Sequence, residues 1–431
     1  MLSDKESSIN QKIEKPSRQR FNIVFMLFIG IMVAYLDRVN VSVFAADSDF
    51  LNYFGIAGKP MEIGLMMSIF LAAYGISGIV LSPIGDYLGP RKSMTICIIT
   101  MAISMLIGGI STTFIVFLIA RVILGLAEGW YYPMQNLYVK NWIPPKERGR
   151  ANATWVIGQS LAPAIAMPLF TWIIAEYGWR ESFFFCMVLS LIPLYLFWFR
   201  STDKPEEHKK VNKEELQYIR NGLADERSNI SQQTKLSFRE RIKPFANNQK
   251  YWLLVLWYIS LQIVYWGLVS WLPAYLKTAK GFSWAEMGWL ASMPFVVAVL
   301  LKTVNGILND KIGRSAPLLF LAMFLGGIFI LLASIVTGKY PAAFCMIFAF
   351  GFASMATSSA WTLLQTLIPA SSLSSASGIM NGLSLGLSSL SPVFLGAIIH
   401  FTGSYDTGLF GLVAVCAIAS IASGILITKK C

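Results

Sequence analysis

Long apolar runs alternate with short polar segments along almost the whole chain. Each run has about 20 residues, the length that a helix needs to cross a hydrocarbon layer. The pattern predicts membrane-spanning helices at residues 21–45, 62–82, 93–112, 114–141, 152–175, 182–199, 251–276, 286–308, 317–336, 341–367, 376–399 and 407–427. The composition agrees, because only 13% of the residues are charged, against about 25% in soluble proteins. We therefore expect an all-α membrane protein with twelve transmembrane helices.

The chain also contains an internal repeat. SPIGDYLGPRK (82–92) follows the second apolar run, and NGILNDKIGRS (305–315) follows the eighth. Their aspartates, Asp86 and Asp310, are 224 residues apart. A second pair of loops, WIPPKERGRANA after the fourth run and LIPASSLSSASG after the tenth, matches at nearly the same spacing, with Ile-Pro pairs 225 residues apart. Two independent matches at one spacing predict a duplicated unit of six helices.

The repeat and the polar segments divide the chain into five parts. We expect a cytoplasmic tail at 1–20, a six-helix half at 21–199, a cytoplasmic linker at 200–250, a second half at 251–427 and a short tail at 428–431. In the linker, Leu216, Ile219 and Leu223 recur at helical spacing among charged residues. This spacing predicts short amphipathic helices on the cytoplasmic membrane surface. A solvated linker without such helices is the alternative.

The net charge of +12 is distributed unevenly. With the amino terminus placed in the cytoplasm, the cytoplasmic side holds 27 lysines and arginines, counting Lys140 at the end of the fourth span, the outer loops hold five, and the interiors of the spans hold three. Such an excess on one side is the positive-inside rule. The basic balance therefore indicates orientation and contact with anionic lipid, and it does not indicate a nucleic-acid partner. We expect a multi-pass protein of the cell membrane with both termini in the cytoplasm.

The five cysteines lie far apart, and no CxxC motif or Cys/His cluster occurs. The sequence therefore indicates no disulfide framework, metal site or cofactor. The two histidines, His208 in the linker and His400 at a helix end, form no acid–base set with the intramembrane residues. This argues against a membrane-embedded enzyme. The first 20 residues contain no apolar core of a signal peptide, so we expect the first span to remain in the mature protein.

Five charged residues lie well inside the predicted spans, away from their ends: Asp37, Arg38, Arg121, Glu128 and Lys302. Charges in a membrane are costly and usually mark a functional site in the bundle interior. Arg121 and Glu128 are seven residues apart, about 10 Å along one helix face. We expect Asp37 and Glu128 to compete for Arg121 while Arg38 faces a cavity, which would form a coupled titrating system. The alternative is a salt bridge that only locks two helices.

Lys302 has a simpler interpretation. It lies about two helical turns from the cytoplasmic end of its predicted span, near Asp310. The lysine stem is long enough to carry its ammonium to the membrane surface. We expect Lys302 to be a surface-seeking residue of this kind.

Two six-helix halves around a charged linker, with GDYLGPRK after the second helix, resemble the major facilitator superfamily. Three further stretches, YLDRVNVSV, RVILGLAEGWYYPMQN and WIPPKERGRANA, resemble the anion:cation symporter family within it. Bacterial members of that family include proton-coupled carriers of galactonate, glucarate and hexuronates. The resemblance implies a secondary transporter that takes up an organic anion together with protons by alternating access.

The resemblance also implies roles for residues. Proton coupling would involve Asp37, Glu128 and Arg121. Substrate binding would involve Arg38, Tyr35, Tyr74, Gln159, Ser358, Trp361 and Asn381. These residue types suit a polyhydroxy anion, with a guanidinium for the carboxylate and amides and phenols for hydroxyls. The repeated loops would supply gating residues, namely Asp86, Arg91, Asp310 and Arg314.

Several alternatives concern the substrate and the direction of transport. The vesicular glutamate branch of the family differs by a further arginine in the seventh helix, where this chain reads YWGLVSWLPAYL without a charge. This disfavours a dianion that needs two separate cations, although Arg121 could still provide the second one. Aromatic acids and dicarboxylates remain alternatives to a sugar acid. A proton-driven exporter is less favoured because the fifth helix lacks the GxxxGP pattern of exporters. We expect a monomer.

Overall fold

The computed structural model describes residues 15–81, 85, 87–232 and 243–431. Within these residues, twelve helical segments are long and apolar enough to cross a membrane. The predicted fold class is confirmed.

The N-terminal half consists of α1 (Gln19–Phe44), α2 (Ser48–Tyr53), α3 (Pro60–Val80), α5 (Pro90–Ile110), α6 (Phe114–Gly129), α7 (Tyr131–Trp142), α8 (Pro145–Tyr177), α9 (Trp179–Leu189) and α10 (Leu191–Arg200). The linker contains η1 (Pro205–Glu207) and α11 (Lys213–Gln232). The C-terminal half consists of α13 (Gln249–Ala274), η2 (Tyr275–Ala279), α14 (Trp284–Ile312), α15 (Ala316–Ile335), α16 (Lys339–Met355), α17 (Thr357–Leu367), α18 (Ala370–Ser388), α19 (Ser391–Thr402) and α20 (Tyr405–Thr428).

Several membrane spans are built from two helices in sequence, and prolines explain three of the interruptions. The breaks between α6 and α7, α9 and α10, and α18 and α19 come just before Pro133, Pro193 and Pro392. A proline inside a helix removes one backbone donor and clashes with the carbonyl four residues earlier. Each break therefore falls at the turn that precedes the proline.

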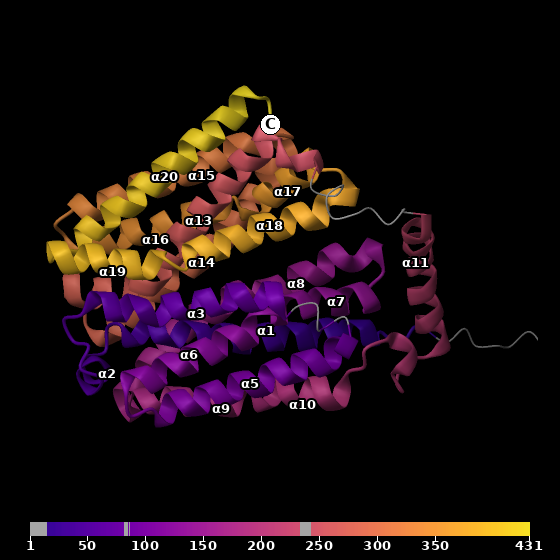
Figure 1. Cartoon of the computed structure of the whole chain (residues 1–431), viewed down its shortest axis with the longest axis horizontal. Helices are drawn as coiled ribbons and strands as arrows, with labels where there is room; N and C mark the ends of the chain where they lie inside the picture. Colours follow the sequence, from indigo (N-terminus) through magenta and orange to yellow (C-terminus); the bar gives the residue numbers. More distant parts are fainter. Residues whose placement is uncertain (1–14, 82–84, 86, 233–242) are drawn as a thin grey trace, which may run out of the picture.

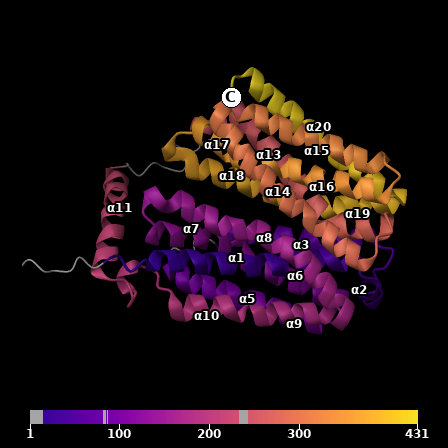
Figure 2. The same ribbon diagram turned by 180° about the vertical axis from the view of Figure 1, so that it is seen from behind.

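Figures 1 and 2 show the two halves as separate bundles, the N-terminal half in indigo and magenta and the C-terminal half in orange and yellow. The bundles lie closest together near α2 and α19 and diverge toward α11. We call the end that carries α11 the linker end, and the opposite end, near α2, the far end.

At the far end, α3 and α19 join the halves through glycines. A Cβ added to Gly64 would lie 2.3 Å from the carbonyl oxygen of Pro392, and one added to Gly396 would lie 2.2 Å from that of Pro60. The backbones therefore touch where only glycine leaves room. The hydroxyl of Ser68 in α3 also accepts a 3.1 Å hydrogen bond from the backbone N–H of Val393, a first-turn donor without a partner inside its own helix.

A second junction between the halves joins α8 to α14. The indole nitrogen of Trp284 donates a 2.6 Å hydrogen bond to the carbonyl oxygen of Thr171. A Cβ on Gly288, one turn further along α14, would lie 2.6 Å from the Thr171 hydroxyl. Both junctions lie at the far end, so the described halves are sealed there and diverge toward the linker end.

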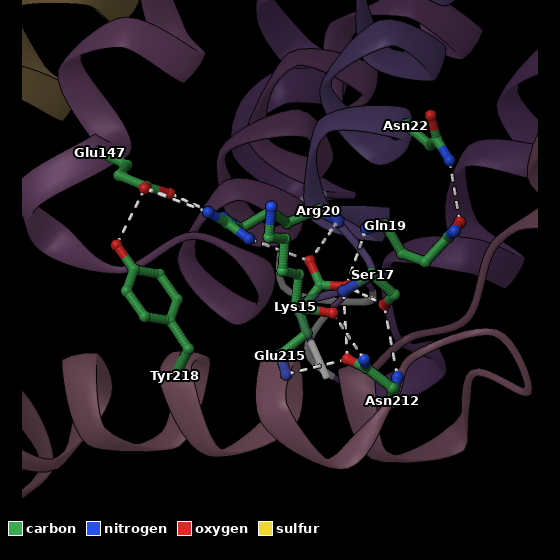
Figure 3. A network of polar contacts seen from close by, with 9 residues as sticks. All are labelled: Lys15, Ser17, Gln19, Arg20, Asn22, Glu147, Asn212, Glu215 and Tyr218. Carbon is green, nitrogen blue, oxygen red and sulfur yellow. Dashed lines mark hydrogen bonds and ion pairs between the residues drawn. The ribbon is translucent and has the colours of Figure 1, made fainter. Parts of the chain in front are cut away.

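The linker helix α11 is docked on the N-terminal half through Glu215 (Figure 3). Its carboxylate is fully buried and accepts hydrogen bonds from the Ser17 hydroxyl, from the backbone N–H groups of Gln19 and Arg20, and from Nη1 of Arg20. Arg20 also donates from Nε to Glu147, 2.8 Å away. The network therefore ties the start of α1, the start of α8 and the linker helix together.

The apolar residues of α11 at helical spacing, Leu216, Ile219 and Leu223, form a stripe whose contacts differ from the predicted ones. The helix is present as expected, but Ile219 is only 1% exposed and Leu223 7%. A Cβ on Gly222 would lie 2.6 Å from the Pro144 side chain. The stripe thus packs on the N-terminal half, and the prediction that it faces the membrane surface was wrong.

The Glu215 network predicts how the docking of α11 depends on pH. Burial alone would raise the pKa of Glu215, but hydrogen bonds from Ser17, Gln19 and Arg20 outweigh burial and hold the pKa below its ordinary value of 4.5. A carboxyl group of this kind stabilises the docked state above its ordinary pKa, and the contribution is lost as the pH falls below it. A spin label at exposed position 217, on a cysteine-free background, should therefore stay immobile from pH 8 to pH 5 and become mobile only at lower pH.

The same label provides a matched comparison. Glu215→Gln should mobilise it already at pH 7, because the charged bonds to Arg20 are lost. Glu206→Gln, which removes only the exposed pair with Arg220, should leave it immobile. Equal mobility in the two variants would contradict the assignment of Glu215 as the docking residue.

The contact of Gly64 with Pro392 predicts a shift between conformations. In Gly64→Val the new side chain cannot fit against the Pro392 carbonyl, so the far end should open in a large share of molecules, at a cost of about 1–3 kcal/mol for the closed state. Spin labels at exposed positions 52 and 402 should move apart in distance measurements. Gly378→Ala is the control, since nothing lies within 4 Å of its added Cβ; an unchanged distance in Gly64→Val would show that the contact does not hold the far end closed.

Candidate substrate and proton site

Two glycines bring α3 and α6 into backbone contact. A Cβ on Gly125 would lie 2.4 Å from the carbonyl oxygen of Phe70, and one on Gly129 would lie 2.2 Å from that of Tyr74. The two glycines are four residues apart, so they share one side of α6, in the spacing that lets membrane helices approach closely. The approach brings Glu128, in the last turn of α6, next to the aromatic side chains of α3.

Arg38 of α1 pairs with Glu128. Its Nε donates a 2.9 Å hydrogen bond to Oε2 of Glu128, and its Nη2 donates to the same oxygen. Both side chains are buried, with 5% and 2% exposure. The second oxygen, Oε1, has no hydrogen-bond partner among the described residues. The pair therefore leaves one carboxylate oxygen of Glu128 without a hydrogen bond in that part of the chain.

Aromatic rings from both halves surround the guanidinium of Arg38. Its carbon lies 4.3 Å from the ring centre of Tyr35 and 4.9 Å from that of Tyr74. Phe70 follows at 5.3 Å and Trp266 at 5.5 Å. Trp266 belongs to α13 of the C-terminal half, whereas the other three belong to the N-terminal half. Arg38 therefore lies at the junction of the halves, held by cation–π contacts as well as by its ion pair.

The expected pairing of Arg121 with the two acids is wrong. Arg121 is 1% exposed; its Nε donates a 3.2 Å hydrogen bond to the carbonyl oxygen of Met66, and its guanidinium lies 4.7 Å from the Phe70 ring centre. Its Nη1 has no partner among the described residues. The arginine that contacts Glu128 is Arg38, because the close packing of α3 and α6 presents Glu128 to α1.

Asp37 lies on a different side of α1 from Arg38, as adjacent helical residues must. It is fully buried, and neither of its carboxyl oxygens has a hydrogen-bond partner among the described residues. It lies beside the Cys186 thiol and interacts electrostatically with Glu128 and Arg121. Asp37 is therefore buried inside the N-terminal half, and its carboxyl group is not part of the Arg38–Glu128 ion pair.

The residues predicted to bind substrate fall into separate groups. Tyr35 and Tyr74 contact Arg38. Trp361 of α17 lies 5.5 Å, between ring centres, from Tyr258 of α13. One turn earlier, Ser358 accepts a 3.3 Å hydrogen bond from Asn305 of α14.

Gln159 in α8 and Asn381 in α18 are half-buried. Neither makes a side-chain hydrogen bond within the described part of the chain, so no contact yet joins them to either group. Their predicted role in substrate binding stays a prediction.

Sequence reasoning missed several residues of this region. Trp266 carries no charge, and the sequence prediction considered only charged residues in the seventh span, although aromatic rings also bind cations. Tyr265, next to it, packs against Phe350 in a tilted arrangement, with ring centres 5.0 Å apart. Asn305 is 1% exposed and was read as part of a loop motif. The spacing of Gly125 and Gly129 was the signal that could have placed Glu128 against α3.

The predicted gating arginines have matching partners in the two halves. Arg91, at the start of α5, donates from Nη2 to the carbonyl oxygen of Trp198, 2.5 Å away, near the end of α10. Arg314 donates from Nη2 to the carbonyl oxygen of Ile427, 3.1 Å away, near the end of α20. Each arginine thus binds the last span of its own half, and neither crosses between the halves in this structure.

The two repeated loops turn at glycines with a positive φ, +78° at Gly89 and +67° at Gly313. Asp203, just after α10, accepts a 2.8 Å hydrogen bond from the backbone N–H of Arg91 and so stabilises the start of α5. Asp86 and the side chain of Asp310 lie outside the described residues, and their gating roles stay predictions.

The fold and the site can now be compared with known proteins. A family model described as Major Facilitator Superfamily matches residues 27–392. The chain belongs to the major facilitator superfamily. Its similarity to curated relatives extends over nearly the whole length: it is 28% identical to a probable sulfoacetate transporter of Cupriavidus necator, over 95% of each chain. It is 27% identical to a probable galactarate/D-glucarate transporter of Bacillus subtilis, over 96% of this chain and 92% of that protein.

Among solved structures, a bacterial homologue of the human lysosomal transporter Spinster matches with a TM-score of 0.75 at 17% identity, over 97% of each chain. This likeness supports the fold. The family model and the curated relatives confirm the predicted family, and as a member of it the protein is a multi-pass membrane transporter of small molecules, not an enzyme. Its relatives include sugar-acid transporters, as the motifs in the first and fourth helices led us to expect.

Proposed function

We propose that the protein is a symporter that takes up an organic acid together with protons, with sugar acids as the favoured class. The observation that carries this proposal is the buried Arg38–Glu128 pair at the junction of the halves. A guanidinium suits a carboxylate because it can donate two parallel hydrogen bonds. The names of the relatives support the same class, since sulfoacetate, galactarate and glucarate are all organic acids.

Exchange of partners at Arg38 would couple the acid to the proton. A proton that binds Glu128 neutralises its carboxylate and breaks the pair, and Arg38 then becomes available to the carboxylate of the substrate. Without either ligand, Arg38 and Glu128 compensate each other's charge in a low-dielectric setting. Asp37 and Arg121, which interact electrostatically with Glu128, would take part in the proton transfer.

The orientation of the chain is part of the proposal. The excess of lysine and arginine at the linker end supports a cytoplasmic position for that end and for both termini, in the cell membrane. The described conformation, sealed at the far end, would then open toward the cytoplasm. Alternating access would proceed by movement of the halves about the site near Arg38.

Arg38→Lys tests the role of the guanidinium. The variant keeps the positive charge but loses the planar pair of donors, so the affinity for the transported acid should fall about tenfold or more. Binding is measured on purified protein by thermal shift with a panel of carboxylates, since a ligand that binds the folded state raises its melting temperature. Arg200→Lys, at an exposed position, is the control and should bind as wild type does.

Glu128→Gln tests proton coupling. In the wild type, acid binding requires a proton on Glu128, so the affinity should rise up to tenfold for each unit that the pH falls. The variant imitates the protonated state, so its affinity should not vary with pH. In proteoliposomes it should exchange acid between loaded compartments but should not accumulate acid along a pH gradient. Wild-type accumulation by the variant would contradict the proposed coupling.

A further inference from the structure

Lys302 is a further intramembrane cation, and it has no acidic partner in the described structure. It lies within the apolar span Trp284–Asn309 of α14 and is half-buried. None of the described carboxylates lies within 4.0 Å of its ammonium group. A charge in this position is costly, and the ion pair of Arg38 has no counterpart here.

The position of Lys302 on α14 contradicts the expectation that it seeks the membrane surface. Ala291, Phe295 and Ala298 form the buried stripe of the helix, with exposures of 0%, 3% and 2%. Lys302 continues this stripe at the same spacing. The lipid side carries Leu300 at 61%, and Val304 and Ile307 at 50% and 54% exposure. The side chain of Lys302 therefore starts from the interior side of the bundle.

Two neighbouring contacts fix which part of the interior Lys302 faces. Gly288 abuts Thr171 of the N-terminal half, and Lys302 follows Gly288 by 14 residues, which places it within about 40° of the same direction. Leu301 instead faces Gly351 of its own half, 3.1 Å from an added Cβ. Phe295, seven residues before Lys302 and on the same stripe, packs against Phe350 of its own half, with ring centres 4.9 Å apart. Lys302 therefore starts from the interior side of α14, between the direction of Thr171 and that of Phe350, on the linker side of the junction.

Polar groups accompany Lys302 on α14. Asn305, one turn closer to the linker end, donates from Nδ2 to the hydroxyls of Ser359 at 2.8 Å and Ser358 at 3.3 Å. Its Oδ1 is buried and has no partner among the described residues. The C-terminal half therefore carries the ammonium of Lys302 on α14 and, one turn away, a buried amide oxygen without a partner among the described residues.

We infer that Lys302 binds a second acidic group of the substrate, so that the transported acid is a dianion that bridges Arg38 and Lys302. This inference rests on the proposed function and assigns the class of substrate. When a proton neutralises Glu128, Arg38 and Lys302 together carry two positive charges. A dianion neutralises both, whereas a monoanion leaves one charge uncompensated in a low-dielectric site.

The structure removes the earlier objection to a dianion. A dianion needs two cations. The seventh helix supplies no arginine, and Arg121 was expected as the only other possible second cation. Arg121 instead binds the Met66 carbonyl inside the N-terminal half. Lys302 supplies the second cation from the eighth span, and its place in the opposite half means that a bridging dianion contacts both halves at once.

The test compares acids that differ by one acidic group. The probes are glucarate and gluconate, which share a six-carbon chain, and sulfoacetate and acetate, which share a two-carbon chain. Affinities of the purified full-length protein are measured by calorimetry. For at least one pair, wild type should bind the diacid at least tenfold more tightly than the monoacid, as expected for an added charged hydrogen bond. Lys302→Met should reduce this preference to less than threefold, because only the diacid loses an ion pair.

Two further variants keep the result interpretable. Lys302→Arg should retain the diacid preference, which separates loss of the cation from loss of folding. Lys311→Met removes an exposed charge from the same helix and should behave as wild type. Failure of wild type to bind any of the four acids would overturn the proposed function. Binding of the acids without a diacid preference, or a preference that survives in Lys302→Met, would overturn the inference alone.

Discussion

The buried pair of Arg38 and Glu128 is the interaction on which the rest of the structure depends. Each charge is costly in the bundle interior without the other, so the structure is stabilised when the helices keep the two side chains within hydrogen-bond distance. Gly125 and Gly129 do this by letting α6 approach α3. The rings that enclose the guanidinium include Trp266 of the other half. Any movement of the halves therefore changes the environment of this pair, which is why a site here can respond to the conformation of the whole protein.

The far-end junctions and the site are built on the same helices. At the far end, glycines and short polar contacts join α3 to α19 and α8 to α14, and the halves diverge from there toward the linker end. The same helix, α3, carries Gly64 near its start and Tyr74 beside Arg38. The same helix, α14, carries Gly288 at the junction and Lys302 further along. A ligand that contacts these helices in both halves would therefore act directly on the elements that close the far end.

Much of the fold could be predicted from the sequence, because apolar length and period are local properties. The twelve spans followed from hydrophobic runs, and the breaks before Pro133, Pro193 and Pro392 follow from the chemistry of one residue. The site was predicted only in part. The charged residues were recognisable, but the choice of Arg38 over Arg121 as the partner of Glu128 depends on how closely three helices approach, which no single stretch encodes. The direction of Lys302 required knowing which face of α14 meets lipid and which meets Thr171.

The contacts of the linker have a consequence for how the chain can be divided. Beyond the Glu215 network, the segment after α10 is fastened to the N-terminal half by hydrogen bonds from Trp142 to Thr202 and from Asn141 to Asp203. In the described structure the linker up to Leu223 therefore belongs physically to the first half, although in the sequence it lies between the two. If the gene were split between α11 and α13, the first fragment would keep both the Glu215 network and the hydrogen bonds from Trp142 and Asn141. Two separately expressed polypeptides would then meet chiefly through the far-end contacts and the rings around Arg38, which makes fragment complementation a direct measure of how strongly the halves recognise each other.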